Sequence, residues 1–581
     1  MGRAAVLLTV VGAGLPAWAQ RPDPATSPGA LLPQGSPIPR ILPSVPPAVA
    51  PGTTLTRPVA PASTDAGSVA IGSVSVAGAT AFPPGQLESI TAGLVGPAVP
   101  VARIEAARAA LLSLYRTEGF VLTTVSATVV PGPRGGALRF SVIEGRIVAV
   151  KLEGDVGPAG VQVLRFLNHL TERQPLDNAT LERWLLLARD VPGVTVHAVL
   201  QPSVTDPGAL TLVAEVQRQA VNGLLTADNR AFRQTGPVEG LLIVDLNSVT
   251  QLGEKTELSI YHTDGGTQNF GQASTEFFVG GSGLKVRLSG GYGKAQPSDF
   301  LRVIGYQGFT TTFGLAATYP VIRSRQQTLN VIANLDLVET EIRTNSGPAG
   351  QPERAGRDSL RIARLGFEYA LEDQVAGGAR PAVNFASLRV SQGLSFLGGS
   401  GVHDATLSRP NERPDFTKVA AELSRTQTLF VPREGTSVAL KARVVGQGSG
   451  DVLPPAEKFF LGGSEINRGF YSGEVTGDNA LAWSLELQLN TGLDLTLFNY
   501  PVPVTAQFYA FYDRGETWEN QKSDPNTRLS SEGIGGRFAI TRYTAFDVEG
   551  VVRNTRLPVG TPGVVRPLKA DAVYWRVVTR F

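Results

Sequence analysis

The sequence contains no cysteine and only four histidines among its 581 residues. The absence of cysteine excludes a disulfide framework, a thiolate zinc site and a cysteine nucleophile. The histidines are His169, His197, His262 and His403. None stands at metal-ligand spacing from another, so we expect no metal centre and no cofactor. No P-loop, GxSxG or HExxH motif occurs, so the sequence predicts a protein without enzymatic activity.

Charge and long apolar runs are also scarce. Charged residues make up 18% of the chain, and 52 basic residues nearly balance 50 acidic ones, leaving a net charge of +2. This balance lacks the basic excess of a nucleic-acid-binding protein, so we expect no nucleic-acid partner. No stretch of 18 apolar, uncharged residues occurs, which excludes a bundle of membrane-spanning helices. A membrane β-barrel stays open, because its strands are only half apolar.

The N-terminus has the pattern of a secretory signal peptide. Arg3 gives a short positive start, residues 4–15 are mostly apolar, and Ala17 and Ala19 fit the small-x-small cleavage rule. We expect residues 1–19 to be removed on export, since the alternative, a membrane anchor, needs about 20 apolar residues. Residues 20–67 follow, with 12 prolines among residues 20–63. Proline favours extended backbone, so this segment is predicted to be a disordered linker rather than a plug.

Residues 68–145 and residues 146–218 show the same order of elements: strand, helix, helix, strand, strand. In the first unit we expect strands at 69–76, 121–130 and 137–144, and helices at 84–94 and 100–118. In the second unit we expect strands at 147–152, 194–201 and 210–217, and helices at 161–169 and 178–189. A repeated supersecondary unit indicates two similar small α+β domains in tandem.

From residue 219 to residue 581, apolar and polar residues alternate with period two. The segment 483–490, for example, reads WSLELQLN. Such a strand has one apolar face and one polar face. Many runs are about 9–12 residues long, which fits tilted membrane strands. Because a β-array in a membrane must close on itself, we predict a 16-stranded antiparallel transmembrane barrel, or 17 strands if residues 300–319 form two strands.

The chain ends on an amphipathic strand that carries aromatic residues. Trp575 and the terminal Phe581 fall on one face, together with Val573, Val577 and Thr579. A Phe-terminated strand of this kind resembles the outer-membrane sorting signal of bacterial barrels. The alternative is an ordinary edge strand of a soluble sheet.

A glycine-rich segment, residues 459–478, reads FFLGGSEINRGFYSGEVTGD. It is too long for a tight turn, and loops longer than about 12–15 residues are usually functional or disordered. Arg468 lies at its centre, flanked by Asn467, Gly469 and Phe470. We therefore select this segment as the candidate functional loop.

A second feature lies in the expected strand 504–514 and reads FYDRG at its end. Alternation places Phe511 and Asp513 on the lumen face, and Gly515 follows them. A carboxylate among aromatic residues requires a cation, and we predict that Arg468 is this cation. Arg–carboxylate pairs are often bidentate and geometrically specific. The alternative is two solvated surface charges of little energetic value.

The loop and the strand together resemble motifs of the BamA/two-partner-secretion superfamily. Residues 466–470 (INRGF) are similar to the [V/I]RG[Y/F] core of its sixth extracellular loop, although Asn467 stands where Val or Ile is usual. Phe511-x-Asp513-x-Gly515 matches the [F/G]-x-D-x-G strand motif in full. The repeated units resemble POTRA domains. Two of them before a barrel are typical of TpsB transporters of the ShlB/FhaC/HecB type.

The resemblance implies an outer-membrane translocator that exports a secreted TpsA-type exoprotein without ATP and can activate a haemolysin- or adhesin-like partner. Periplasmic POTRA domains would capture the unfolded exoprotein, and the Arg468 loop, pinned to Asp513, would maintain the secretion-competent conformation. Contacts with outer-membrane lipids, and with the barrel-assembly machinery during biogenesis, are also implied. Two other functions stay open. An insertase usually carries more POTRA domains, and a passive porin-like channel would need none.

Overall fold

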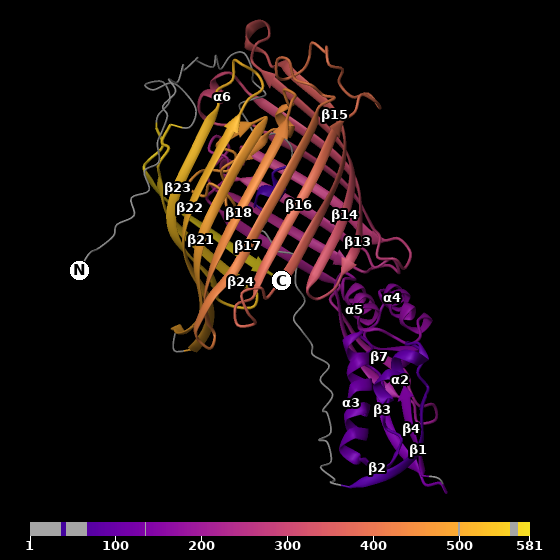
Figure 1. The fold of residues 1–581 in the computed structure, drawn as a ribbon. Coiled ribbons are helices and arrows are strands. Elements are labelled where there is room, and N and C mark those ends of the chain that lie inside the picture. The colour runs from indigo at the N-terminus through magenta and orange to yellow at the C-terminus, as the bar shows by residue number, and fades with distance from the viewer. Residues whose placement is uncertain (1–35, 42–66, 134, 498–499, 558–566) are drawn as a thin grey trace, which may run out of the picture.

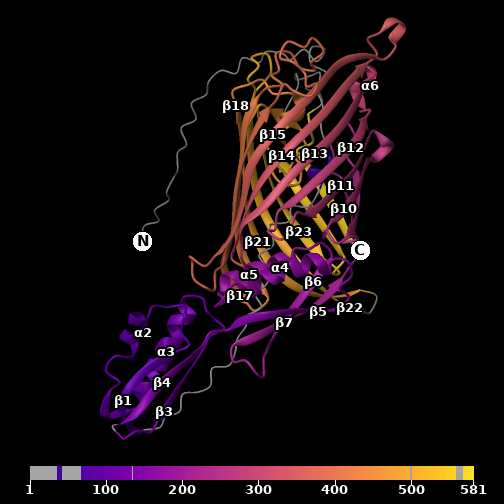
Figure 2. The same cartoon turned by 90° about the vertical axis from the view of Figure 1, so that its right-hand side faces the viewer.

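A computed structural model describes residues 36–41, 67–133, 135–497, 500–557 and 567–581. Two small α+β units precede one large barrel (Figure 1). The units lie at one end of the barrel, and long loops lie at the other (Figure 2). The predicted signal peptide, residues 1–19, lies outside the described residues, as does most of the proline-rich segment.

The first unit is a four-stranded sheet covered by two helices. Its elements are β1 (Ser68–Ala77), α2 (Pro84–Thr91), β2 (Gly96–Pro100), α3 (Val101–Thr117), β3 (Thr124–Val130) and β4 (Gly136–Ile143). The strand order is β2-β1-β4-β3, and β1 is parallel to β4. Helix α3 buries Leu111 and Tyr115 against Phe140 of β4. The sequence pattern does not predict β2, because Pro97 and Pro100 lack backbone donors and are tolerated only at a sheet edge.

The second unit has a three-stranded sheet with order β5-β7-β6. Its elements are β5 (Arg146–Gly154), α4 (Gly160–Glu172), α5 (Asn178–Arg189), β6 (Val194–Pro202) and β7 (Ala209–Arg218). Phe166 and Leu167 of α4 pack in its core with Leu212 of β7. Helix α5 begins as predicted because the Asp177 carboxylate caps it, accepting a hydrogen bond of 2.8 Å from the Thr180 N–H. Among the described residues, no helix is both long and apolar enough to cross a membrane.

Sixteen antiparallel strands close into a barrel. They are β8 (Val221–Asp228), β9 (Glu239–Asn247), β10 (Lys255–Thr263), β11 (Gln268–Phe278), β12 (Lys285–Ala295), β13 (Gln307–Arg323), β14 (Gln327–Thr344), β15 (Glu353–Asp373), β16 (Ala382–Gly393), β17 (Thr417–Arg433), β18 (Thr436–Ser449), β21 (Asn479–Leu497), β22 (Tyr500–Trp518), β23 (Thr527–Ala539), β24 (Thr544–Arg553) and β25 (Asp571–Arg580). Strand β25 pairs with β8 to close the ring. The predicted fold class, with 16 strands, is confirmed. Residues 300–319 contribute only one strand, because helix α6 (Asp299–Val303) precedes β13.

The barrel wall is apolar outside and polar inside. On β21, Leu485 and Leu487 expose 45% and 50% of their surface, whereas Glu486 between them exposes 2%. The period-two alternation of the sequence therefore sorts lipid-facing from lumen-facing side chains. Short 3₁₀ turns in the loops occupy Asp264–Gly266, Pro348–Gly350 and Pro455–Glu457.

The second α+β unit is docked on the end of the barrel (Figure 2). Phe278 of β11 enters the core of this unit and meets Phe166 edge to face, with 5.1 Å between the ring centroids. Arg323 at the end of β13 donates to both carboxylate oxygens of Asp190, at 2.8 Å each. An apolar contact and a bidentate ion pair thus fix the orientation of the unit relative to the barrel.

A short piece of the proline-rich segment lies inside the barrel. Helix α1 (Ile38–Ile41) buries Ile38 against Leu241 and Ile243 on the lumen face of β9 and against Phe270 of β11. The linker prediction for residues 20–67 does not anticipate this contact. A four-residue helix held only by tertiary packing leaves no periodic signal in the sequence.

Candidate functional site

The loop between β18 and β21, residues 450–478, folds back into the barrel, and we call it the lumen loop. Its hairpin is formed by β19 (Phe459–Leu461) and β20 (Val475–Gly477). Leu461 and Phe470 are fully buried in a cluster with residues of β18, β21 and β23. Gly462 has a φ of 104°, and a Cβ there would lie 2.3 Å from a backbone oxygen, so only glycine fits this turn. The lumen loop therefore packs on the inner wall instead of projecting into solvent.

Arg468, at the tip of the lumen loop, contacts Asp513 on β22. Its backbone N–H and its Nε donate to Asp513 Oδ2 at 2.8 and 3.0 Å, and its Nη2 donates to Oδ1 at 2.9 Å. Arg468 exposes 3% of its surface and Asp513 exposes none. The guanidinium also covers the ring of Phe511, with Cζ 3.8 Å from the centroid. The structure thus brings together the predicted partners, and their burial excludes two solvated surface charges.

A second carboxylate and a hydroxyl complete this cluster. Glu486 of β21 contacts Arg468 Nη1 and also accepts from Arg537 of β23 at 2.7 and 3.1 Å. Ser484 accepts from Arg468 Nη2 at 3.0 Å and donates to Asp513 Oδ1 at 2.6 Å. Two guanidinium groups therefore face two carboxylates, so the buried charge is balanced. Such a network is stable only while every partner is present.

Gly469 binds the tip of the lumen loop to strands β23, β24 and β25. Its N–H donates to Ser531 Oγ at 3.1 Å, and its carbonyl accepts from Arg553 Nε at 2.5 Å and from the Tyr574 hydroxyl at 3.2 Å. A Cβ at Gly469 would lie 2.4 Å from the Ser531 Cβ. Any larger side chain would therefore push the tip away from β23.

Asn467 explains the departure from the usual motif. Its φ is 53°, in the left-handed region that Asn tolerates and β-branched residues avoid. Its Nδ2 donates to the Leu529 carbonyl at 3.1 Å. Its Oδ1 would lie 2.5 Å from a Cβ at Gly515, so the absence of a side chain at Gly515 makes room for the Asn467 side chain.

The two residues predicted as a sorting signal lie at the closing seam of the barrel. Phe581 exchanges backbone hydrogen bonds with Gly223 at 2.9 and 3.1 Å, and the residue is 51% exposed. The Trp575 N–H donates to Asn229 Oδ1 at 2.9 Å. Both residues contribute to closure, and their role in sorting stays a prediction.

The residues around the tip that sequence reasoning missed include Glu486, Arg537, Arg553 and Tyr574. Glu486 and Arg537 carry a usable signal, because strand alternation places both on the polar lumen face. Alternation places Arg553 and Tyr574 on the lumen face as well, but nothing in the sequence indicates that they reach Gly469 from strands β24 and β25, about 80–110 residues further along the chain.

The sequence model for the haemolysin secretion/activation proteins ShlB/FhaC/HecB matches residues 209–538, more than half of the chain. The chain belongs to the ShlB/FhaC/HecB family. A second match, to the ShlB-type POTRA domain, covers residues 69–145 of this family member. Comparison with curated proteins found no match.

Solved structures with a similar fold include two CdiB proteins. CdiB from Escherichia coli has a TM-score of 0.67 at 18% identity, and the match covers 91% of this chain and 93% of that one. CdiB from Acinetobacter baumannii has a TM-score of 0.58 at 17% identity, with 94% and 95% covered. At these identities the likeness concerns the fold alone.

This ShlB/FhaC/HecB protein is therefore a TpsB-type transporter of a two-partner secretion system. It lies in the outer membrane with its POTRA region in the periplasm, and its family implies a secreted TpsA-type partner. The barrel end that carries the α+β units faces the periplasm, and the end with the long loops faces the exterior (Figure 1).

Proposed function

We propose that this transporter threads an unfolded exoprotein through its barrel without ATP, and that Arg468 keeps the lumen loop in the conformation that secretion requires. The observation that carries the proposal is the buried pair of Arg468 and Asp513 inside the lumen. A buried pair with several charge-assisted hydrogen bonds defines one position of a long loop. Losing one partner leaves an uncompensated charge, so the loop leaves this position.

The first step of export is capture in the periplasm, and the proposal assigns it to the α+β units. Residues 68–145 form the first POTRA domain and residues 146–218 the second, supported by their similar element order and mixed sheets. Their edge strands, β2 and β3 in the first sheet and β5 and β6 in the second, accept an extended segment through backbone hydrogen bonds. Docking of the second unit keeps this segment near the entrance of the barrel.

The lumen beside the loop tip suits the passage of a polypeptide. A cavity of about 370 Å³ is lined by charges of both signs, among them Arg443, Glu486 and Glu549. Paired charges keep a passing chain hydrated without selecting one sign. We further propose that the exported partner is haemolysin- or adhesin-like and is activated on passage. Outer-membrane lipids surround the apolar outer wall, and the barrel-assembly machinery inserts it.

The test is secretion of a co-expressed candidate exoprotein, with outer-membrane levels of the transporter matched between strains. Arg468→Ala should reduce secretion at least tenfold while the barrel still assembles. Arg514→Ala is the matched control, because Arg514 is the neighbour of Asp513 but its side chain is 39% exposed and pairs with Glu516. Normal secretion by Arg468→Ala would refute the role of Arg468. Defective assembly of other barrels on depletion, with no secretion by any variant, would instead favour an insertase.

A further inference from the structure

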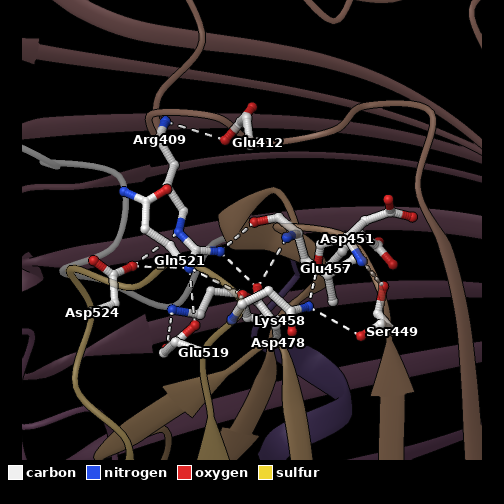
Figure 3. A network of polar contacts seen from close by, with 12 residues as sticks. Arg409, Glu412, Ser449, Asp451, Glu457, Lys458, Asp478, Glu519, Gln521 and Asp524 are labelled. Carbon is white, nitrogen blue, oxygen red and sulfur yellow. Dashed lines mark hydrogen bonds and ion pairs between the residues drawn. The ribbon is translucent and has the colours of Figure 1, made fainter.

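Arg409 lies in the loop between β16 and β17, residues 394–416, at the extracellular end of the barrel, and it is fully buried. Figure 3 shows its guanidinium facing carboxylates from other loops. Nη1 and Nη2 donate to the two oxygens of Asp478 at 2.6 and 3.1 Å. Nη2 also donates to Glu519 and to Asp524, at 2.9 Å each. One side chain thus binds three carboxylates.

These contacts join segments that are far apart in the sequence. Asp478 is the last residue of the lumen loop, and Arg409 Nη1 also donates to the carbonyl of Leu453, near the start of that loop, at 2.8 Å. Glu519 belongs to the loop between β22 and β23, residues 519–526. Lys458 supplies a second cation, donating to Glu519 at 2.6 Å. Without Arg409, three buried or half-buried carboxylates would face a single lysine, so the loops would separate.

The joined loops also pack on the inner wall of the barrel. Phe416 and Leu453 are fully buried and pack against Leu360 and Ile362 of β15. These two residues lie on the same face of β15 as Arg364, which reaches inward to Glu457 of the lumen loop. The loops therefore bury an apolar cluster against the inner face of β15, next to the extracellular exit.

The wall holds the loop that carries Arg409. The backbone N–H of Ser408 donates to Asp358 Oδ1 of β15 at 2.9 Å. The backbone N–H of Arg409 donates to Glu412 Oε2 at 3.1 Å, which fixes the turn around it. Ser408 thus binds residues 394–416 to β15. Arg409 in turn binds the lumen loop and the loop of residues 519–526 to residues 394–416.

We propose that Arg409 is the hub of a latch that holds residues 394–416, 450–458 and 519–526 across the extracellular exit, and that the latch opens when the exported chain passes. This inference rests on the proposed translocation function. Because Asp478 ends the lumen loop, opening the latch also frees the base of that loop, while Arg468 still holds its tip.

The first experiment locks the latch with an engineered disulfide. The Arg413 N–H donates to the Val452 carbonyl at 2.8 Å. A backbone contact this short brings the two Cα atoms near the range of about 4.4–6.8 Å that a disulfide spans. The chain has no cysteine of its own, so Arg413→Cys with Val452→Cys gives an unambiguous bond. Oxidation should reduce secretion at least tenfold, and a reductant should restore it.

The matched control is a disulfide within the wall. Gln392 and Thr417 are register partners on β16 and β17, and their side chains touch at 2.6 Å. The pair Gln392→Cys with Thr417→Cys should secrete equally well when oxidised and when reduced. Parental secretion by the fully oxidised 413–452 pair would overturn the latch.

A second measurement does not depend on any exoprotein. The purified full chain in a planar bilayer should open at least tenfold more often when the 413–452 pair is reduced than when it is oxidised, and Arg409→Gln should open more often than the parent. If the parent secretes no candidate but reduction still raises opening, the translocation proposal fails and the latch stands. Equal opening in both redox states would overturn the latch.

Discussion

Replacing Asp513 by Asn tests how strongly the lumen loop is held. The substitution keeps the shape of the side chain but removes the charge that accepts three hydrogen bonds from Arg468, of 2.8–3.0 Å. Removing one partner of a buried ion pair costs roughly 3–5 kcal/mol. Glu486 still contacts Arg468, so we expect a cost at the low end, about 3 kcal/mol. Since 1.4 kcal/mol is a factor of ten, the undocked population should rise on the order of 100-fold.

Thiol labelling measures this population directly, because the chain has no cysteine. Ser472, in the lumen loop, exposes only 8% of its surface, so Ser472→Cys reacts when the loop leaves the wall. In the Asp513→Asn background its labelling rate should rise on the order of 100-fold. Asp494→Asn on β21 is the control, because Asp494 is exposed and makes no ion pair within the described part of the chain.

A separate reporter distinguishes undocking from unfolding. Ser259 of β10 is 2% exposed, and Ser259→Cys should stay unlabelled in every folded variant. If Ser472→Cys reacts at the same rate with and without the Asp513→Asn substitution while the barrel stays folded, Asp513 does not hold the loop. The buried pair would then not determine the position of the loop tip.

Two further changes test the loop contact and the first α+β unit. Gly515→Ala would place a Cβ 2.7 Å from the Leu461 side chain, so overpacking of about 1–3 kcal/mol should raise labelling of Ser472→Cys at least fivefold, whereas Gly492→Ala, which meets nothing within 4 Å, should not change it. Burial raises the pKa of Glu144, but hydrogen bonds from Thr80, Tyr115 and Ala81 outweigh this and lower it. The ionised carboxylate therefore stabilises the folded unit fully above the ordinary glutamate pKa of about 4.3. This stabilisation is lost as the pH falls through the lower pKa of the folded state. Glu144→Gln should therefore cost about 1 kcal/mol at pH 7 and raise hydrogen exchange of residues 78–92 about fivefold; this difference from wild type should shrink in acid, and a difference independent of pH would contradict the assignment to the carboxylate.

The barrel was predictable because alternation is a property of each strand alone. A segment such as 483–490 fixes which side chains face lipid, whatever strand lies beside it. The helices of the second unit were predictable for a similar reason, since apolar periodicity and the Asp177 cap are local. Strand β2 was not, because its prolines contradict strand propensity and only its place at the sheet edge permits them.

In the candidate site too, residues that stand in a local sequence pattern could be predicted and residues joined only by long-range contacts could not. Arg468 and Asp513 could be selected because each stands in a recognisable local pattern. Arg409 could not be selected, since nothing in the sequence around it distinguishes it from an arginine on the protein surface. Its partners lie 44 to 115 residues further along the chain, and only the folded barrel brings them together. A buried charge cluster made of long-range contacts has no sequence signature of its own.

Two arginines bind the lumen loop at different places, one at its tip and one at its base, and we expect their loss to have different effects. Arg468 fastens the tip to β22, deep in the wall, whereas Arg409 fastens the base, through Asp478, to the loops at the exit. In the latch proposed above, an outgoing chain would displace the loops that bury Phe416 and Leu453, so strain would reach Arg409 without passing through the tip. The two arginines should therefore differ in the sign of their effects. We expect loss of the tip anchor to reduce secretion, and loss of the latch to make the exit open more often.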